Sequence, residues 1–576
     1  MTAALDTLAE EFWDAVVAAD PAEATAIGDY RYADRLSDIT PAGRAALARR
    51  FEEIRAEVAA LPPETDPEAE LTRATLRQGV DVRLALLAAD PFSFTVDAMS
   101  GAQAAFLNIP SYQPLRDVAD GESMLARWWA MGPWVDQQIA QLRRGAGEGR
   151  TPVAGSVRRV ITQLDELLDR PLEDWPMLAP LQAEHAGWSD GAWRAFEVGL
   201  GGAVRDGLRP AFARYRAYLA DEALAGARDE AHVGICHLAG GVETYASLAR
   251  AHTTTDKSPQ EIHETGLAEI ARIDAEIAEL GGRVLGTADL AGTLEALRGD
   301  PSVHFRSADE IVGVAEASLA RAFAAIPGWF GRLPRAECVV VRMEPHEERH
   351  STIAYYRQPP QDGSRPGRYY VNTYAPETRP RYEAEALAFH EAVPGHHLQI
   401  AIGQELEHLP SFRRHAETTA FVEGWGLYAE RLADEMGLYS GDLDRIGMLS
   451  YDAWRASRLV VDTGMHALAW SRAQAIEFMT AHTALGLNNI ANEVNRYIGW
   501  PGQALAYKIG QLEIRRLRSE AEAALGASFD IRRFHDAVLG HGALPLSVLR
   551  SSVASELGLP STSGSPSASP SASPSV

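Results

Sequence analysis

Apolar side chains recur at helical spacing along almost the whole of this chain, and this periodicity limits the fold more than any other feature. Near the middle, Ser258, Pro259 and Glu261 form the pattern of a capped helix start. With 576 residues and 46% hydrophobic composition, the chain can bury a large core of packed helices. The sequence therefore predicts a mainly α fold, with clear helices over residues 5–20, 41–61, 204–226, 258–280 and 307–325.

Strand-like patterns are confined to one region. ECVVVRM (337–343) and RYYVNT (368–373) are rich in β-branched or aromatic residues, and a Pro/Gly-rich loop lies between them. We expect a small antiparallel sheet before the helix that carries residue 390. A Gly/Pro-rich stretch near residue 330 suggests a helical first part over 1–330 and a second part over 331–558. The Ser/Pro-rich end, 559–576, is predicted to be disordered.

Charge and cysteine content restrict the partners. The net charge of −25 repels phosphate backbones, so nucleic acid is not an expected partner. Cys236 and Cys338 lie far apart, which argues against a disulfide framework and for a reducing cytosol. The N-terminus has no basic stretch before an apolar core, and no run approaches 18 apolar residues. We expect a cytoplasmic protein with no membrane partner; the oligomeric state is unknown at this stage.

The segment HEAVPGHH (390–397) departs from the helical pattern around it. In the familiar HExxH arrangement, two histidines four residues apart share a helical face and bind zinc, while the glutamate activates water. Here Pro394 takes the place of the second histidine, so the helix must bulge or break. Such a bulge can bring His396 back beside His390. We favour His396 as the second ligand because a Gly-His pair follows the bulge, and His397 is the alternative.

A third ligand is expected from ETTAFVEGWGLYAERLA (417–433). One face of this helix is marked by Phe421, Trp425, Tyr428 and Leu432. Glu423 points to the other face, which is also largely apolar, so its carboxylate needs a cationic partner or a metal. Two histidines and one carboxylate leave a position open for water, as in catalytic zinc sites. The sequence predicts one Zn²⁺ held by His390, His396 and Glu423, with Glu391 as the base.

Several longer motifs resemble the DUF885 family of bacterial proteins. They are FHEAVPGHHLQ (389–399), FVEGWGLYAE (421–430), RYIGWPGQALAYKIGQLEIRRLR (496–518), GRYYVNTYAPETRPRYEAEALAFHEA (367–392), ARAHTTTDKSPQEIHE (249–264) and FHDAVLGHGALPL (534–546). The resemblance covers approximately residues 10–555. It implies a zincin-like metallopeptidase fold, similar to all-helical peptidases that enclose a deep cleft. It also implies His390, a second histidine of the 396/397 pair and Glu423 as zinc ligands, with Glu391 as the base.

Two later helices offer accessory groups. In the stretch 451–470, a polar stripe of Arg455, Arg458, Asp462 and His466 interrupts an apolar helix. In one interpretation Arg458 binds substrate and His466 takes part in catalysis. In the other the stripe is a buried Arg458–Asp462 pair or a solvated face.

The helix after Pro501 carries Gln503, Tyr507 and Gln511 on one face. Tyr507 could donate to an oxyanion, Lys508 could hold a substrate carboxylate, and Gln503 could contact the substrate. Tyr497, just before this helix, competes for the oxyanion role. For each tyrosine the alternative is packing with a hydrogen bond.

A third set of contacts is expected from the strand at 369–373. An extended peptide could pair along its edge and contact Tyr370 and Asn372. The alternative is a short sheet that only packs against helices.

These observations favour a zinc peptidase that acts on short peptides. A zinc hydrolase of a non-peptide amide would use the same chemistry. A helical binding protein with a non-catalytic zinc site is the alternative from another class, and Glu391 argues against it, because a structural zinc site needs no acid/base carboxylate beside its ligand. No GxSxG motif is present, so a serine hydrolase is not expected.

Overall fold

The structure is a computed structural model that describes residues 1–559 except 349–350, 361–362, 364 and 416–417. The Ser/Pro-rich end predicted to be disordered lies, apart from residue 559, outside the described residues. The protein is mainly helical, as the periodicity predicts. The first helices are α1 (Ala3–Ala19), α2 (Pro21–Ala26), α3 (Pro41–Ala60), α4 (Pro67–Ala89), α5 (Ala102–Asn108), α6 (Val118–Gly147), α7 (Ala154–Leu168), α8 (Asp190–Gly202), α9 (Arg209–Tyr218) and α10 (Leu224–Gly226).

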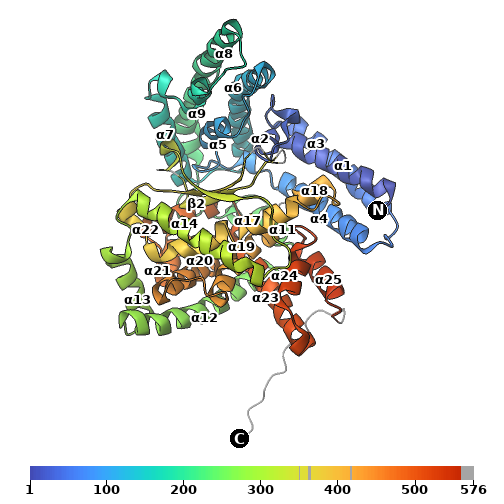
Figure 1. Cartoon of the computed structure of the whole chain (residues 1–576). Helices are drawn as coiled ribbons and strands as arrows, with labels where there is room; N and C mark the ends of the chain where they lie inside the picture. The colour runs from blue at the N-terminus through green and yellow to red at the C-terminus, as the bar shows by residue number, and fades with distance from the viewer. Residues whose placement is uncertain (349–350, 361–362, 364, 416–417, 560–576) are drawn as a thin grey trace.

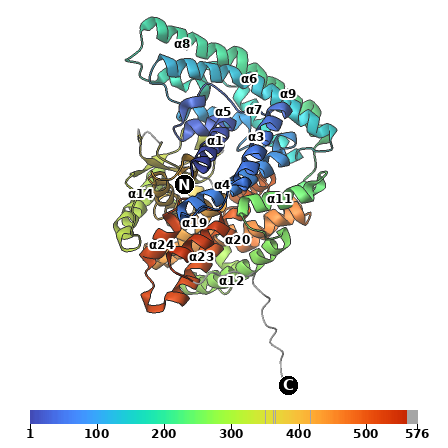
Figure 2. The ribbon, with the colours of Figure 1, turned by 90° about the vertical axis from the view of Figure 1, so that its right-hand side faces the viewer.

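The later helices form the larger body of the molecule. They are α11 (Gly241–Thr253), α12 (Pro259–Leu285), α13 (Leu290–Gly299), α14 (Ala308–Ala325), α15 (Pro345–Glu348), α16 (Ala384–Glu391), α17 (His396–Gln404), α18 (Ser411–Arg414), α19 (Thr419–Glu435), α20 (Asp442–Ala467), α21 (Arg472–His482), α22 (Leu487–Gly499), α23 (Ala506–Leu525), α24 (Ile531–Leu539) and α25 (Leu546–Glu556). Helices α5 to α9 lie on one side of the molecule, and α12, α20 and α23 lie on the other (Figures 1 and 2). The capping box predicted at Ser258 and Glu261 is present at the start of α12.

A small sheet lies between these two groups of helices, where β2 is labelled in Figure 1. Its strands β1 (Cys338–Arg342), β3 (Gly367–Val371) and β2 (Ala354–Arg357) stand in the order β1-β3-β2. β2 and β3 are antiparallel, but β1 and β3 are parallel, so the expected antiparallel sheet is mixed. The long connection from β1 to β3 allows the parallel pairing, because it is long enough to return the chain to the same end of the sheet. The strand-like sequence patterns also did not predict β2.

The helices that position the candidate site pack closely because glycines face each other. α19 packs along α23, and α12 packs along α20. A Cβ at Gly424 of α19 would lie 2.5 Å from the backbone of Gly510 in α23. A Cβ at Gly510 would in turn lie 1.8 Å from the carbonyl oxygen of Ala420. Only glycine permits this approach, which brings the side chains beside these positions on the two helices within reach of each other.

The main hydrophobic core joins residues from before and after position 330. It includes Ile311 and Leu319 of α14, Phe389 of α16, and Phe421 and Trp425 of α19. The expected boundary near residue 330 stays a prediction.

Helix α14 is relevant to the question of whether this protein contacts a membrane. Ala308–Gly328 is the one stretch of the described residues that is long and apolar enough to cross a membrane by length and composition alone. Here it is amphipathic: Ile311 and Leu319 are buried, while Asp309 and Glu316 are exposed. Its buried side packs on α16 and β1. The expectation of no membrane partner stays a prediction.

Candidate metal centre

The distorted helix around residue 394 creates the first half of the site. α16 ends at Glu391, a turn follows, and α17 begins at His396. A Cβ at Gly395 would lie 1.9 Å from the carbonyl oxygen of His390, so no other residue fits this turn. Proline removes a backbone donor here, and glycine allows the tight return of the chain. The break therefore places His390 and His396 side by side rather than on separate helical faces.

Three side chains converge at this break. The Nε2 atoms of His390 and His396 lie 3.6 and 3.4 Å from the same oxygen, Oε2 of Glu423. The centroids of the two imidazole rings are 4.6 Å apart, and their planes are nearly perpendicular, at 83°. One ligand atom from each residue lies within 4.8 Å of the other two. The group could hold a metal ion, and it unites the histidine, second histidine and carboxylate expected from the sequence.

The donor atoms suit a metal ion better than they suit one another. At 3.4 to 3.6 Å neither imidazole makes a strong hydrogen bond to Glu423, whereas ligands about 2.1 Å from a tetrahedral ion stand about 3.4 Å apart. Within the described residues, Oε2 of Glu423 and Nδ1 of His396 are buried with no hydrogen-bond partner. The side chains of His390, His396 and Glu423 are 3%, 10% and 19% exposed, so the group opens to solvent on one side. Buried on most sides and open on one, the donors fit a catalytic type of site.

Gly426 keeps room for both imidazoles. It follows Glu423 by one turn of α19, and a Cβ there would lie 2.8 Å from Cε1 of His390 and 3.0 Å from Cε1 of His396. Any larger side chain would press on both ligands. The two glycines in FVEGWGLYAE thus serve different purposes, since Gly424 admits α23 and Gly426 admits the histidines.

A second carboxylate orients the first ligand. Glu430 lies two turns after Glu423 on α19, is fully buried, and accepts a hydrogen bond from Nδ1 of His390 at 2.8 Å. A metal-binding histidine commonly donates its other ring N–H to a carboxylate, which fixes the ring and increases its basicity. Sequence reasoning missed Glu430. Its spacing of seven residues from Glu423 on one helix was the available signal.

The electrostatics of the site favour a cation. Burial opposes the charged form of His390, but Glu423 and Glu430 outweigh it and raise the pKa of His390 to about 9. Burial also opposes ionisation of Glu423, yet the two imidazoles beside it hold the pKa of this carboxyl well below its usual range. The pocket thus stabilises positive charge beside Glu423, whether carried by protons on the imidazoles or by a metal ion.

His397 does not join the group. It is fully buried, its Nδ1 lies 2.9 Å from the hydroxyl of Tyr356, and its Nε2 lies 3.0 Å from the carbonyl oxygen of Ala336. Burial lowers the pKa of His397 to about 4. With both nitrogens bonded to the sheet region, His397 is excluded as the alternative ligand, because residues 396 and 397 point in different directions from the first turn of α17.

The comparisons with known proteins cover nearly the whole chain. Residues 21–553 match the family model described as "Bacterial protein of unknown function (DUF885)". The chain belongs to the DUF885 family. No functionally characterised protein among the curated sequences matches this DUF885 protein significantly.

Two solved structures show the same fold. One, described as "the putative lipoprotein from Colwellia psychrerythraea", has a TM-score of 0.90 and 25% identity, over 97% of this chain and 100% of that chain. The other, described as "a putative lipoprotein of unknown function from Shewanella oneidensis", has a TM-score of 0.72 and 17% identity, over 96% of this chain and 99% of that chain.

In the DUF885 protein Tyr507 lies beside the histidines. Its ring is nearly parallel to that of His390, with 6.3 Å between centroids and 17° between planes. Burial and the nearby charge of Glu423 raise the pKa of the Tyr507 hydroxyl. The tyrosine is therefore a neutral donor near the cluster. Gln503 lies next to it, buried, and its Oε1 accepts a hydrogen bond from Nη1 of Arg496 at 2.8 Å.

Arg458 and Tyr497 belong to a buried network. The guanidinium of Arg458 lies 4.2 Å from the ring centroid of Tyr507, donates to the Tyr497 hydroxyl at 2.9 Å and pairs with Glu493 at 3.0 Å. The Tyr497 hydroxyl also donates to Glu493 at 2.7 Å and accepts from Trp454 at 2.9 Å. Fully bonded, Tyr497 has no hydrogen left for an oxyanion. The expected Arg458–Asp462 pair is not formed within the described residues, since Asp462 instead binds Tyr245 and the Gly502 amide.

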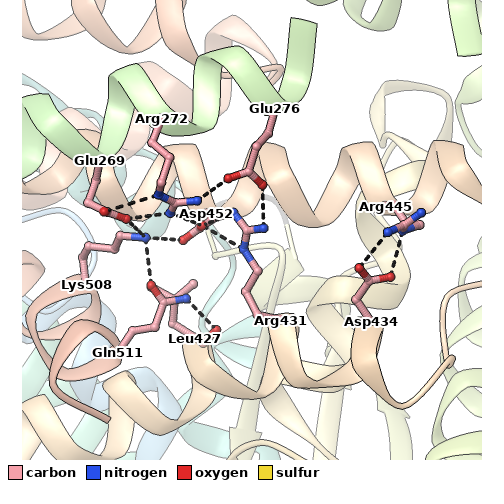
Figure 3. Close-up of polar contacts among 10 residues, drawn as sticks. All are labelled: Glu269, Arg272, Glu276, Leu427, Arg431, Asp434, Arg445, Asp452, Lys508 and Gln511. Atoms are coloured by element: carbon pink, nitrogen blue, oxygen red, sulfur yellow. Dashed lines mark hydrogen bonds and ion pairs between the residues drawn. The ribbon is translucent and has the colours of Figure 1, made fainter. Parts of the chain in front are cut away.

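Lys508 takes part in a different, fully buried network. It is fully buried, and its Nζ lies 2.6 Å from Asp452, 2.9 Å from Glu269 and 2.8 Å from Gln511 (Figure 3). The expected role in holding a substrate carboxylate is therefore not available to Lys508. Three acids and three bases join here from α12, α19, α20 and α23: Glu269, Glu276, Asp452, Arg272, Arg431 and Lys508.

Three other expected contacts also have structural roles. In His466, Nδ1 accepts from the Ile235 amide at 3.2 Å and Nε2 donates to the Tyr497 carbonyl at 3.0 Å, so neither nitrogen is free for catalysis. Tyr370 stacks on Tyr355, with 4.8 Å between ring centroids. Asn372 is buried and bonds the backbone around it. β3 lies between β1 and β2, so it has no free edge on which a peptide could pair.

A cleft of about 860 Å³ is linked to the site through a chain of contacts, although none of the three converging side chains lines it. Residues 97–99 and 159–166 line one side, and the segment after β3 and helix α22 line the others. Two of its lining residues, Glu493 and Arg496, bond Arg458 and Gln503, which contact Tyr507. The sequence did not single out Glu493 or Arg496 as functional residues. The cleft thus adjoins residues that contact Tyr507, which packs against His390.

Proposed function

We propose that this protein is a zinc-dependent hydrolase of amide bonds, acting on short peptides, with a fold related to the zincin-like metallopeptidases. The convergence of His390, His396 and Glu423 on one point, with Oε2 of Glu423 lacking a hydrogen-bond partner among the described residues, carries the proposal. Histidine nitrogens and a carboxylate are the donors that zinc prefers in catalytic sites. The cleft of about 860 Å³ is large enough for a short peptide.

In this proposal Glu391 moves the proton. It follows His390 directly at the end of α16, is partly exposed, and makes no hydrogen bond or ion pair with a described residue. A bound zinc ion would polarise the scissile carbonyl and lower the pKa of water to about 7. The Glu391 carboxylate would accept a proton from the attacking water and deliver it to the leaving nitrogen. The Tyr507 hydroxyl would donate to the carbonyl oxygen as negative charge develops there.

The test combines metal content with turnover. We expect the purified protein to bind about one zinc ion per chain, because two imidazoles and one carboxylate form a donor set that binds zinc. Glu391→Gln should keep the metal and lose about 10²- to 10⁴-fold in kcat. Glu407→Gln, at an exposed position in the next loop, is the control and should keep both.

A dipeptide library assayed beside acylated amines would show whether peptides are the substrates rather than other amides. No bound transition metal, or full activity in Glu391→Gln, would contradict the proposal. Bound zinc without hydrolysis of any library member would favour the non-catalytic binding protein.

The cellular location belongs to this proposal as well. The cysteine content leads to the expectation of a cytoplasmic protein, whereas the relative from Colwellia psychrerythraea is described as a "putative lipoprotein". That description favours the cell envelope, and the cytoplasmic expectation stays a prediction. Fractionation of cells into cytoplasm and envelope, followed by detection of the chain, would decide between the two.

A further inference from the structure

Arg455 on α20 is an unusually isolated buried cation. Its residue is 3% exposed, and its guanidinium stacks on Trp454 and Tyr451, at 4.2 and 4.5 Å from the ring centroids. The closest acid is Glu430, whose Oε1 lies 3.5 Å from Nη2. Within the described part of the chain, Nε and Nη1 of Arg455 have no hydrogen-bond partner. Buried guanidinium groups are normally hydrogen-bonded on most of their nitrogens, so these two call for an acceptor.

Arg458, one turn further along α20, adds a third free donor. Its guanidinium stacks on the same indole, 4.6 Å from the centroid of Trp454. Its Nη1 is buried and, among the described residues, has no hydrogen-bond partner. Two guanidinium groups on one indole thus offer three donor nitrogens that have no hydrogen-bond partner among the described residues. Arginine pairs of this kind suit the two oxygens of a carboxylate, which accept hydrogen bonds in parallel.

The charges nearby do not neutralise this pair. Glu493 is shared between Arg458 and Arg496, which leaves one positive charge in that trio. Glu430 already accepts from His390, and it would be offset together with Glu423 by a divalent ion. Arg455 also interacts with Glu383, but burial raises the pKa of that carboxyl to about 8, so it supplies little negative charge at neutral pH. An anion is needed to complete the balance.

Contacts link the arginine pair both to the candidate metal ligands and to the residues that line the cleft. Arg455 neighbours Glu430, which bonds His390, and Arg458 stacks on Tyr507, which packs against His390. On the other side, Arg458 pairs with Glu493, a lining residue of the cleft. A peptide that enters the cleft and places an amide bond at the metal-binding residues would bring its nearby end toward these arginines.

We propose that Arg455 and Arg458 form a subsite for the free C-terminal carboxylate of the substrate, so that the enzyme cleaves short peptides close to that end. This inference rests on the proposed function. It gives to the two arginines the role that Lys508 cannot fill, since Lys508 is fully bonded to Asp452, Glu269 and Gln511.

The first test uses the wild-type, zinc-loaded protein and matched substrate pairs. Each di- or tripeptide is assayed as the free acid and as the C-terminal amide. We expect kcat/KM to be about 10- to 100-fold higher for the free acid, because charge-assisted hydrogen bonds to buried arginines discriminate strongly. Equal values would overturn the subsite and leave the peptidase proposal intact.

Variants identify the residues. Arg455→Gln and Arg458→Gln should each reduce the preference for the free acid by at least tenfold. Arg413→Gln is the matched control: Arg413 on α18 is equally buried and pairs with Glu68 of α4. The control should keep the wild-type preference even if it unfolds more easily. A preference that persists in both α20 variants would overturn the assignment.

A binding measurement separates failure of the subsite from failure of the proposed function. Full-length Glu391→Gln protein supplied with zinc is titrated calorimetrically with glycylglycine, glycylglycinamide and inorganic phosphate. We expect glycylglycine to bind at least tenfold more tightly than the amide, and Arg455→Gln to abolish the difference. Equal binding of acid and amide would sink the subsite even if no peptide were hydrolysed. Phosphate binding as tight as that of glycylglycine would show a general anion site and overturn the assignment to carboxylates.

Discussion

At the scale of single residues, two glutamates on α19 have different roles at the candidate site. Oε2 of Glu423 lies near the Nε2 atoms of both imidazoles. Glu430, two turns later, accepts a hydrogen bond from Nδ1, the other ring nitrogen of His390. Burial has opposite consequences for the two positions. Glu423 keeps contact with solvent on one side, whereas Glu430 has none. The first carboxylate can bind an ion, and the second can only orient a ligand.

Weakening the orienting carboxylate should weaken metal binding without removing it. Glu430→Gln keeps the size of the side chain but loses the charge that favours donation from Nδ1 of His390. We expect zinc affinity to fall by about 10- to 100-fold, measured by competition with a chromogenic chelator. Glu435→Gln, on the same helix but paired with Arg518 at the surface, is the control and should bind zinc normally. Unchanged affinity in Glu430→Gln would show that His390 needs no such support.

At the scale of elements, α12, α19, α20 and α23 contribute the charged side chains of a network that supports the candidate site. Arg431 follows Glu430 on α19, and Lys508 follows Tyr507 on α23. Both reach Asp452 on α20 (Figure 3). Because the six charged side chains balance, removal of one leaves an uncompensated charge in the interior. The network thus couples the position of two site residues to the packing of α12 and α20.

Lys508→Met should therefore be costly for stability. We expect the free energy of unfolding to fall by about 3–5 kcal/mol, because Asp452 and Glu269 lose a buried partner. Denaturant titration followed by tryptophan fluorescence would measure it. Arg445→Gln is the comparison, since Arg445 pairs with Asp434 at a half-exposed position and should cost less than about 1 kcal/mol. Similar losses for the two variants would mean that the network is not special.

At the scale of the whole molecule, one histidine ties the N-terminal helices to the C-terminal end. His541 lies 2.7 Å from Glu68 of α4 and 2.9 Å from Glu556 of α25. Arg413 of α18 also pairs with Glu68, at 2.5 Å. The two carboxylates outweigh burial and raise the pKa of His541 to about 9. Segments more than 470 residues apart in sequence are thus joined by charge.

Stability should depend on pH in the window set by this histidine. Its pKa in the folded state, about 9, is above the unfolded value of about 6.5, so the contribution is complete below pH 6.5 and lost as the pH rises through 9. We expect the free energy of unfolding to fall by about 1–3 kcal/mol from pH 6.5 to 9.5. His541→Gln should make this part of the profile flatter. An identical slope in the variant would assign the pH dependence to other groups.

Local patterns in the sequence were enough to predict the helices and to single out the three side chains that converge. The 3.6-residue periodicity, the capping box at Ser258 and the Pro394–Gly395 break depend on neighbours in the chain, so they can be read without a structure. The pairing of β1 with β3 could not, because strand direction depends on how the chain returns to the sheet. Nor could the second histidine be chosen with certainty, since residues 396 and 397 differ only in where a distorted turn directs them.

The sequence by itself determined a helical protein with two imidazoles and a carboxylate able to meet at a broken helix, because side-chain chemistry and spacing are local properties. Only the tertiary structure decided which other groups lie around these three side chains. Glu430, Arg455 and Lys508 come from separate turns or helices, and whether each faces a ligand, a cleft or an opposite charge depends on how α12, α19, α20 and α23 pack. A charged residue on an apolar helix looks the same in sequence in all three cases, since its partner is supplied by a distant part of the chain.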